Sequence, residues 1–313
     1  MGNRNSRNSR NSRNSTDKIK KKPSINKFNN KLHTEPTTSN EEEKPLKYYL
    51  PNDNDDIDRQ HMHHFVRRYL FQGYFSAPIV VGEGFKILDV GCGAGTWLLD
   101  LANEHQNSIF CGVDISPIFP VEIKPGNLTF IRADLLSGLP FPDNTFDFVH
   151  MQTMAYILTP DQWHYAISEL IRVTKPEGYM ELTEAYDGYG HGPLYTKLSQ
   201  AHHNSCLQRG VDLNFPKQLD NVLRSLRTIT NVNTDKKIVV SGPSGGRVGT
   251  IFADLFIQFS SADLTIESLC PHLNMSKDEC KKFILKDVKK ELYQPKTAEY
   301  CVVRYWAQKI SNN

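Results

Sequence analysis

The sequence predicts an α/β fold built around a doubly wound, mostly parallel β-sheet. Two observations carry this prediction. From Lys86 onward, short apolar runs alternate with segments of helical periodicity, and a turn rich in glycine joins the first apolar run to the first helix. Strands that alternate with helices are joined by crossovers that leave neighbouring strands parallel, with helices packed on the faces of the sheet.

The individual elements follow from the same patterns. Strands are predicted at 86–90, 108–114, 128–133, 146–151 and 178–183, and helices at 96–105 and 160–173. Further along the chain, helices are predicted at 192–209, 215–229, 249–259 and 277–291, and a strand at 236–240. The β-rich segment 299–306 is expected to pair into the same sheet, which fits better than a separate domain.

Length and composition limit the class of protein. The 313 residues allow one large domain with appendages or two modest ones, and the hydrophobic fraction of 39% is that of a globular protein. No run approaches the ~18 consecutive apolar residues of a membrane-spanning helix. The six cysteines have no CxxC or other zinc-like spacing. We therefore expect reduced intracellular thiols and no metal site.

Charge is distributed unevenly. Residues 1–24 carry eight basic residues and one acidic residue, a net charge of +7; since the whole chain carries +2, the remainder carries −5. A mildly acidic body argues against a broad surface for nucleic acid.

The segment 1–46 has the composition of a disordered, basic, low-complexity tail, because its Asn-Ser-Arg repeats and few apolar side chains cannot offset the entropy of ordering it. Its start, Met-Gly-Asn-Arg-Asn-Ser, fits the pattern for myristoylation of Gly2, and a lipid chain beside basic residues is a two-signal membrane anchor. A chance match within a repeat is the alternative. The sequence thus predicts a cytoplasmic protein and leaves peripheral membrane contact open.

A helix is predicted over 58–73. Its apolar residues recur at helical spacing: Met62, Phe65, Val66, Tyr69 and Leu70. We expect them to form the face that packs on the core. His61 and His64 share another face, but no carboxylate or cysteine nearby completes a ligand set, so a polar helix surface is favoured over a metal site.

The main chemical signal is Asp89-Val-Gly91-Cys-Gly93-Ala-Gly95, between the first predicted strand and the first helix. Glycines let the chain turn tightly and approach a ligand, and the helix N-terminus offers free N–H groups. A glycine-rich turn alone also suits a nicotinamide or flavin cofactor. However, the spacing is GxGxG rather than GxGxxG, and Asp89 would suit a cationic amino group rather than a pyrophosphate.

Two further strand ends are acidic. Asp114 ends the second predicted strand, where a carboxylate can accept hydrogen bonds from ribose hydroxyls. Asp134 follows the third, where it would supply an acceptor to an adenine amino group. Three acidic strand ends in order are harder to obtain by chance than one glycine turn. A nicotinamide-dependent oxidoreductase is disfavoured by the glycine spacing and by the absence of a Tyr-x-x-x-Lys-type pair.

At these residues the sequence resembles the class I S-adenosylmethionine-dependent methyltransferases. The segments that carry the resemblance are ILDVGCGAG, GVDIS, ADLLSGLPFPDNTFDFVH and IRVTKPEGYMELTE. More narrowly, RYLFQGYFSAPI, GVDISPIFP and YCVVRYWAQ look like fungal LaeA-like methyltransferases. The resemblance implies a Rossmann-like, seven-stranded sheet and S-adenosyl-L-methionine as cofactor.

The resemblance also assigns expected roles along the chain. Asp89 would face the methionine amino group, Asp114 with Ile115 would bind ribose, and Asp134 with Leu135 would hold adenine. The remaining cofactor positions would be Gly91, Cys92, Gly93 and Gly95 in the turn, and Met151 and Gln152 after the fourth strand, beneath the sulfonium. Cys92 is more simply a small residue that fills space within the turn.

The resemblance divides the chain into the tail 1–46 and a methyltransferase domain 47–313. That domain would comprise the N-terminal helix 58–84, the cofactor-binding core 85–185, an acceptor-side helical insertion 186–235 and C-terminal strands and helices 236–313. The loop 241–249 lacks the ending of a P-loop, so we expect a mobile connection that helps to cover the site.

Catalytic residues are not fixed by the sequence. Methyl transfer is an in-line displacement, so a base is needed only if the acceptor must lose a proton. Weak candidates are His150, Tyr156, Glu184 and His191. The Asn/Asp-Pro-Pro-Tyr/Phe signature of many amine-methylating members is absent after the fourth strand. The acceptor therefore stays open among small molecules, lipids and proteins, and a catalytically silent, cofactor-binding regulator is the alternative.

Overall fold

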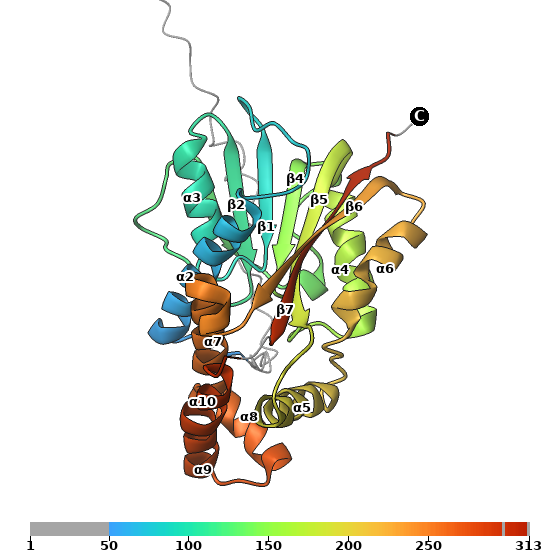
Figure 1. The fold of residues 1–313 in the computed structure, drawn as a ribbon. Coiled ribbons are helices and arrows are strands. Elements are labelled where there is room, and N and C mark those ends of the chain that lie inside the picture. Colours follow the sequence, from blue (N-terminus) through green and yellow to red (C-terminus); the bar gives the residue numbers. More distant parts are fainter. Residues whose placement is uncertain (1–49, 296–297, 312–313) are drawn as a thin grey trace, which may run out of the picture. The chain divides into compact units, whose positions relative to one another are not determined.

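The computed structural model describes residues 50–295 and 298–311. Its centre is one seven-stranded sheet with strand order β3-β2-β1-β4-β5-β7-β6 (Figure 1). The strands are, in chain order, β1 (Lys86–Val90), β2 (Ile109–Asp114), β3 (Leu128–Arg132), β4 (Phe146–Gln152), β5 (Thr174–Asp187), β6 (Ile229–Val240) and β7 (Glu299–Lys309). The predicted fold class, a doubly wound, mostly parallel seven-stranded sheet, is confirmed.

Strands β1 to β5 are parallel, and β7 runs antiparallel between β5 and β6. The predicted terminal strand 299–306 is therefore part of this sheet. Strands β1 and β2 read as nearly continuous buried runs, as expected for parallel strands covered on both faces. Because β1, β2, β4 and β5 point the same way, the residues that follow them meet at one carboxyl edge.

Helices cover both faces and the carboxyl edge of the sheet. Figure 1 shows α2 and α3 on one side, α4 and α6 on the other, and the remaining helices gathered below the carboxyl edge. The helices are α2 (Asn54–Phe71), α3 (Thr96–Glu104), α4 (Pro160–Val173), α5 (Pro193–Leu207), α6 (Leu219–Ser225), α7 (Gly246–Ser261), α8 (Asp263–Leu273), α9 (Lys277–Lys282) and α10 (Lys289–Leu292), with short 3₁₀ turns η1 (Leu135–Ser137), η2 (Phe215–Gln218) and η3 (Pro243–Gly245) and the π-helical segment η4 (Phe283–Val288).

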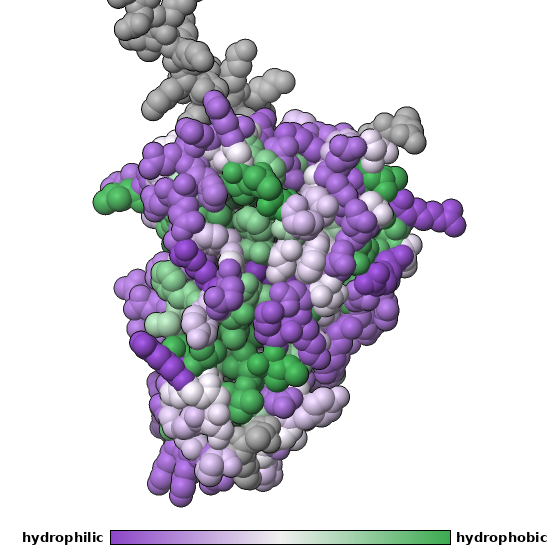
Figure 2. Space-filling view, turned by 45° about the horizontal axis from the view of Figure 1, so that its top comes forward, coloured by the Kyte–Doolittle hydropathy of each residue, from purple (hydrophilic) through white to green (hydrophobic). Residues whose placement is uncertain are grey.

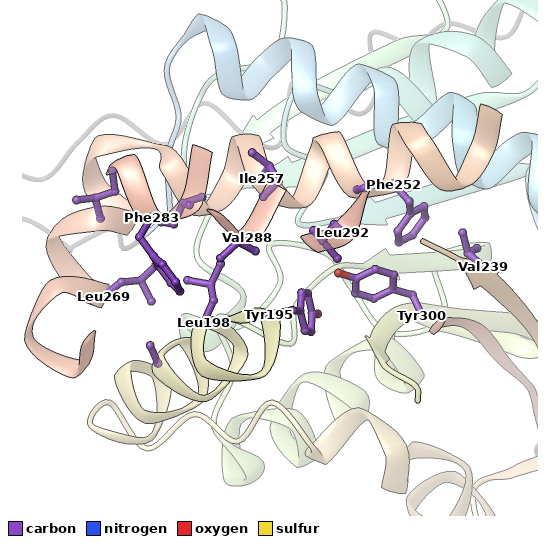
Figure 3. Close-up of a cluster of buried hydrophobic side chains, with 14 of the residues drawn as sticks. Tyr195, Leu198, Val239, Phe252, Ile257, Leu269, Phe283, Val288, Leu292 and Tyr300 are labelled. Atoms are coloured by element: carbon purple, nitrogen blue, oxygen red, sulfur yellow. The ribbon is translucent and has the colours of Figure 1, made fainter. Parts of the chain in front are cut away.

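The helices below the carboxyl edge have a core of their own (Figure 3). Tyr195 and Leu198 of α5 meet Phe252 and Ile257 of α7, while Tyr300 of β7 joins the same cluster. A second cluster packs α3 against the sheet around Trp97, Leu98 and Phe148. The carboxyl edge of the sheet therefore faces this layer of helices. Strands β6 and β7 connect the helical layer to the sheet.

Several predicted elements differ in the structure. The helix predicted at 215–229 is η2 followed by the short α6, because the chain becomes extended at Leu226 and Ile229 pairs with Lys309. The strand predicted at 236–240 is the end of the longer β6. The helix predicted at 277–291 is interrupted by η4. Helix α8 was not predicted.

The predicted apolar face of the N-terminal helix is correct only in part. Val66 is buried in the core and Leu70 packs against it, but Met62, Phe65 and Tyr69 are 43%, 52% and 63% exposed. The inward face of α2 is mixed, because His64 and Arg67 are buried as well. The two histidines contact α3: His61, which is half-buried, has its Nδ1 2.6 Å from Thr96 Oγ1, and the buried His64 has its Nε2 2.8 Å from Asp100 Oδ2.

The loop predicted as a mobile cover, 241–249, consists of η3 and the first turn of α7. A Cβ on Gly245 or Gly249 would collide with the carbonyl oxygen of Val240, so the loop packs closely against the end of β6. Among the described residues, no helix is long and apolar enough to cross a membrane. Figure 2 shows hydrophobic patches interspersed with hydrophilic residues on one face. Gly2 and the predicted tail lie outside the described residues.

Candidate cofactor site

The glycine turn lies where β1 ends and α3 begins. Gly91, Gly93 and Gly95 all have positive φ, at 69°, 52° and 74°. A side chain would be strained at these angles, and a Cβ on Gly95 would also collide with the ring of Phe130. Gly95 is the N-cap of α3 and makes no side-chain cap, so the first N–H groups of the helix face the turn.

Asp89 is fully buried beside this turn. Its Oδ1 lies 2.8 Å from Nδ1 of His150, which stacks on Trp97 of α3 with ring centroids 4.3 Å apart. Its Oδ2 has no hydrogen-bond partner among the described residues. A buried carboxylate oxygen without a partner costs free energy, so it marks a place for a donor that the chain does not provide.

Asp114 ends β2 next to the glycine turn. Its Oδ2 accepts a hydrogen bond from Gly93 N at 2.8 Å, and its Oδ1 accepts one from Ser116 N at 2.8 Å. Burial raises the pKa of this carboxyl group, and the backbone N–H groups partly offset that effect. Each oxygen retains acceptor capacity, as binding of ribose hydroxyls requires. Ile115 follows, half-buried.

The structure places Asp134 after β3, where it caps η1. Its Oδ1 accepts from Leu136 N at 2.9 Å, and its Oδ2 accepts from Ser137 Oγ at 3.1 Å. Leu135 is buried. These bonds fix the carboxylate at the same edge as Asp114, while its assignment to adenine stays a prediction.

Met151 and Gln152 end β4 on the other side of β1. Met151 is buried, and Gln152 Oε1 accepts a hydrogen bond from Arg67 of α2 at 3.2 Å. Helix α2 therefore reaches across the end of β4. Cys92 is buried, and burial raises the pKa of its thiol well above the ordinary value. This favours the space-filling interpretation over a reactive thiol.

The four catalytic candidates occupy different surroundings. Glu184 is buried at the end of β5, where it accepts a hydrogen bond from Met154 N at 2.7 Å; burial raises its pKa to about 7. It holds the turn after β4. Because His150 is engaged with Asp89 and stacked on Trp97, it positions Asp89 in this structure.

Tyr156 and His191 belong to the helical layer. The ring of Tyr156 packs edge-on against His202 and Phe259, with centroids 5.8 and 5.2 Å away, and burial raises its pKa. His191 stacks on Tyr195 at 4.1 Å and its Nε2 lies 2.9 Å from the carbonyl oxygen of Glu299. The structure does not bring His191 into hydrogen-bond contact with His150 or Glu184.

The sequence did not reveal a buried polar layer between the sheet and the segment that follows α2. Glu181 is fully buried and accepts hydrogen bonds from Ser76 N and Ala77 N at 2.7 and 2.8 Å. Arg304 of β7 lies 3.4 Å from Glu181 through Nε. A local signal did exist, since each charged residue stands between buried apolar neighbours: Glu181 between Met180 and Leu182, and Arg304 between Val303 and Tyr305. No group of His, Cys, Asp and Glu in the described residues could hold a metal ion.

A further contact was missed at the turn. Gln60 of α2 accepts a hydrogen bond from Ala94 N through Oε1 at 3.0 Å. A Cβ on Gly93 would collide with that oxygen. The glycine turn is therefore lined by the chain on three sides: Asp89, Asp114 and Gln60.

Taken with the sheet order, this site has the arrangement expected of a class I methyltransferase domain that binds S-adenosylmethionine. The residues fit that molecule, because the unpartnered Asp89 Oδ2 suits an ammonium group and the Asp114 oxygens suit ribose hydroxyls. Residues 87–178 match the family model described as a methyltransferase domain.

Curated relatives come from fungi. The chain is 26% identical to "Methyltransferase str3" of Strobilurus tenacellus over 51% of its length, and 33% identical to "Methyltransferase pytC" of Aspergillus terreus over 44%. It is 29% identical to "Secondary metabolism regulator laeA" of Aspergillus niger over 44%. The matches cover 58%, 42% and 36% of those relatives' own lengths.

Proposed function

We propose that this protein transfers a methyl group from S-adenosylmethionine to a small-molecule, lipid or protein acceptor. The observation that carries the proposal is a glycine turn with positive φ at three glycines, placed between the carboxylates of Asp89 and Asp114. The bound cofactor supplies an electrophilic methyl group on a sulfonium.

The chain would contribute binding, alignment and exclusion of water, which suffice for an in-line displacement. Asp114 would hold the ribose, Asp89 the amino group, and Met151 with Gln152 would lie beneath the reacting centre. Helix α2 would keep water from the turn, since Gln60 and Arg67 connect it to Ala94 and Gln152. No step requires a base unless the acceptor loses a proton.

The acceptor side is proposed to lie at the helical layer, where Tyr156, His202 and Phe259 pack together. The guanidinium of Arg59 lies 5.1 Å from the centroid of Phe259. Aromatic rings beside one cation are suited to an organic acceptor that offers apolar surface and a polar or acidic group. This composition favours a small molecule over a nucleic acid.

A cofactor-binding regulator without turnover is the second candidate. This candidate is favoured because two residues that could act as a base already have partners. Glu184 accepts a hydrogen bond from the turn after β4, and His150 is engaged with Asp89. One curated relative is also named a regulator. Both candidates require the same cofactor site.

Product analysis of the full chain separates the two candidates. With methyl-labelled S-adenosylmethionine and separate small-molecule, lipid and protein fractions from a fungal extract, we expect label in one fraction and matching formation of S-adenosylhomocysteine. The Asp114→Ala variant should abolish both signals. Cofactor binding by the wild type with no labelled product in any fraction would favour the regulator.

A further inference from the structure

Helix α2 presents a single oriented side chain to the glycine turn. Gln60 donates a hydrogen bond from Nε2 to Asp56 Oδ2 at 2.7 Å, and its Oε1 accepts from Ala94 N at 3.0 Å. A carboxylate only accepts hydrogen bonds, so the amide group must turn its NH₂ toward Asp56. Its oxygen is then the atom that faces the turn.

The orientation of Gln60 is held from behind. Asp56 is 4% exposed, and Arg59 binds its Oδ1 through Nε at 2.8 Å. Helix α2 is itself held at its start, where Gln258 of α7 donates to the carbonyl oxygen of Asp55 at 3.1 Å. The carboxamide is therefore fixed before any ligand arrives, which lowers the entropic cost of binding.

We infer that Gln60 recognises the amino-acid end of the cofactor, with Asp56 as the residue that orients it. This inference rests on the proposed function. An α-ammonium group carries three N–H donors and needs acceptors from the protein. Two acceptors border the glycine turn: the oriented Gln60 Oε1 and the unpartnered Asp89 Oδ2. Gln60 thereby adds a contact to the amino-acid end from outside the sheet.

The test combines a truncated side chain with a truncated ligand. S-adenosylhomocysteine carries the amino-acid end, whereas 5′-methylthioadenosine lacks it and retains the ribose and adenine. In calorimetric titrations of the full chain, Gln60→Ala should weaken the binding of S-adenosylhomocysteine about tenfold, the equivalent of about 1.4 kcal/mol. The affinity for 5′-methylthioadenosine should be unchanged. Asp56→Asn should weaken the binding of S-adenosylhomocysteine less than Gln60→Ala does, because an asparagine can donate or accept and no longer fixes the orientation of the Gln60 amide.

Gln106→Ala is the matched control, because Gln106 is exposed in the turn after α3. It should bind both ligands as the wild type does. If Gln60→Ala weakened the binding of both ligands equally, Gln60 would only shape the glycine turn, and the inference would be overturned. Unchanged or tighter binding of S-adenosylhomocysteine would also overturn it, since Gln60 would then be irrelevant or a competitor. A wild type that binds neither ligand would instead refute the proposed function.

Discussion

Replacing Asp114 by alanine is expected to weaken binding of S-adenosylhomocysteine at least about 100-fold. Hydrogen bonds to a charged acceptor contribute about 1.5–3 kcal/mol each, and two ribose hydroxyls would lose theirs. At about 1.4 kcal/mol for each factor of ten, even the lower values give this loss. The variant also loses the acceptors for Gly93 N and Ser116 N, which shape the turn. Calorimetric titration measures the change.

Two controls separate ligand contact from a misshapen turn. Asp114→Asn keeps one acceptor oxygen and the side-chain volume, so we expect an intermediate affinity. Asp287→Ala removes an exposed carboxylate on η4 and should leave affinity unchanged. If Asp114→Ala folds normally and binds S-adenosylhomocysteine within threefold of the wild type, Asp114 does not hold the ribose.

Replacing Glu181 by alanine is expected to lower the free energy of unfolding by about 3–5 kcal/mol, the cost of breaking a buried ion pair by removing one partner. Arg304, 3% exposed, would keep its charge without the carboxylate beside it. Ser76 N and Ala77 N would lose their acceptor as well. Urea denaturation monitored by circular dichroism measures the loss.

Glu122→Ala is the control for this prediction, because Glu122 is exposed and should cost less than about 0.5 kcal/mol. Glu181→Gln should fall between the two, since its amide oxygen can still accept from one backbone N–H. A loss below about 1 kcal/mol for Glu181→Ala would mean that the polar layer is hydrated and can lose this carboxylate, and that it is not a fixed part of the core.

The sequence was sufficient for the parallel half of the sheet. Strand β1 and helix α4 occupy the predicted residues. Strand β1 is a short, mostly apolar run that ends at the glycine turn, and α4 is a periodic pattern with clear ends. At β6 the signal was weaker: it is an edge strand whose burial alternates with exposed polar residues, so only its apolar end at 236–240 was recognised. Helix α8 contains Pro271, and a proline inside a segment argues against a helix because it has no backbone N–H to donate.

The candidate site could be predicted only where it is local in sequence. Asp89 and Asp114 lie at the ends of β1 and β2, the three glycines follow β1, and parallel topology brings such ends together. The role of α2 could not be read in this way. Apolar spacing identified Val66 and Leu70 correctly but also pointed to Met62, Phe65 and Tyr69. The buried polar residues of α2, His64 and Arg67, have partners on α3 and β4, namely Asp100 and Gln152. Such long-range partners leave no periodic signal in the helix.

Titration of the full wild-type chain with S-adenosylhomocysteine and, separately, with NAD⁺ tests the central claim most directly. A glycine turn between Asp89 and Asp114 predicts a micromolar dissociation constant for S-adenosylhomocysteine, about −8 kcal/mol, and no binding of NAD⁺. Binding of NAD⁺ alone, or of neither molecule, would contradict the assignment of this edge of the sheet to a methyl-donor cofactor.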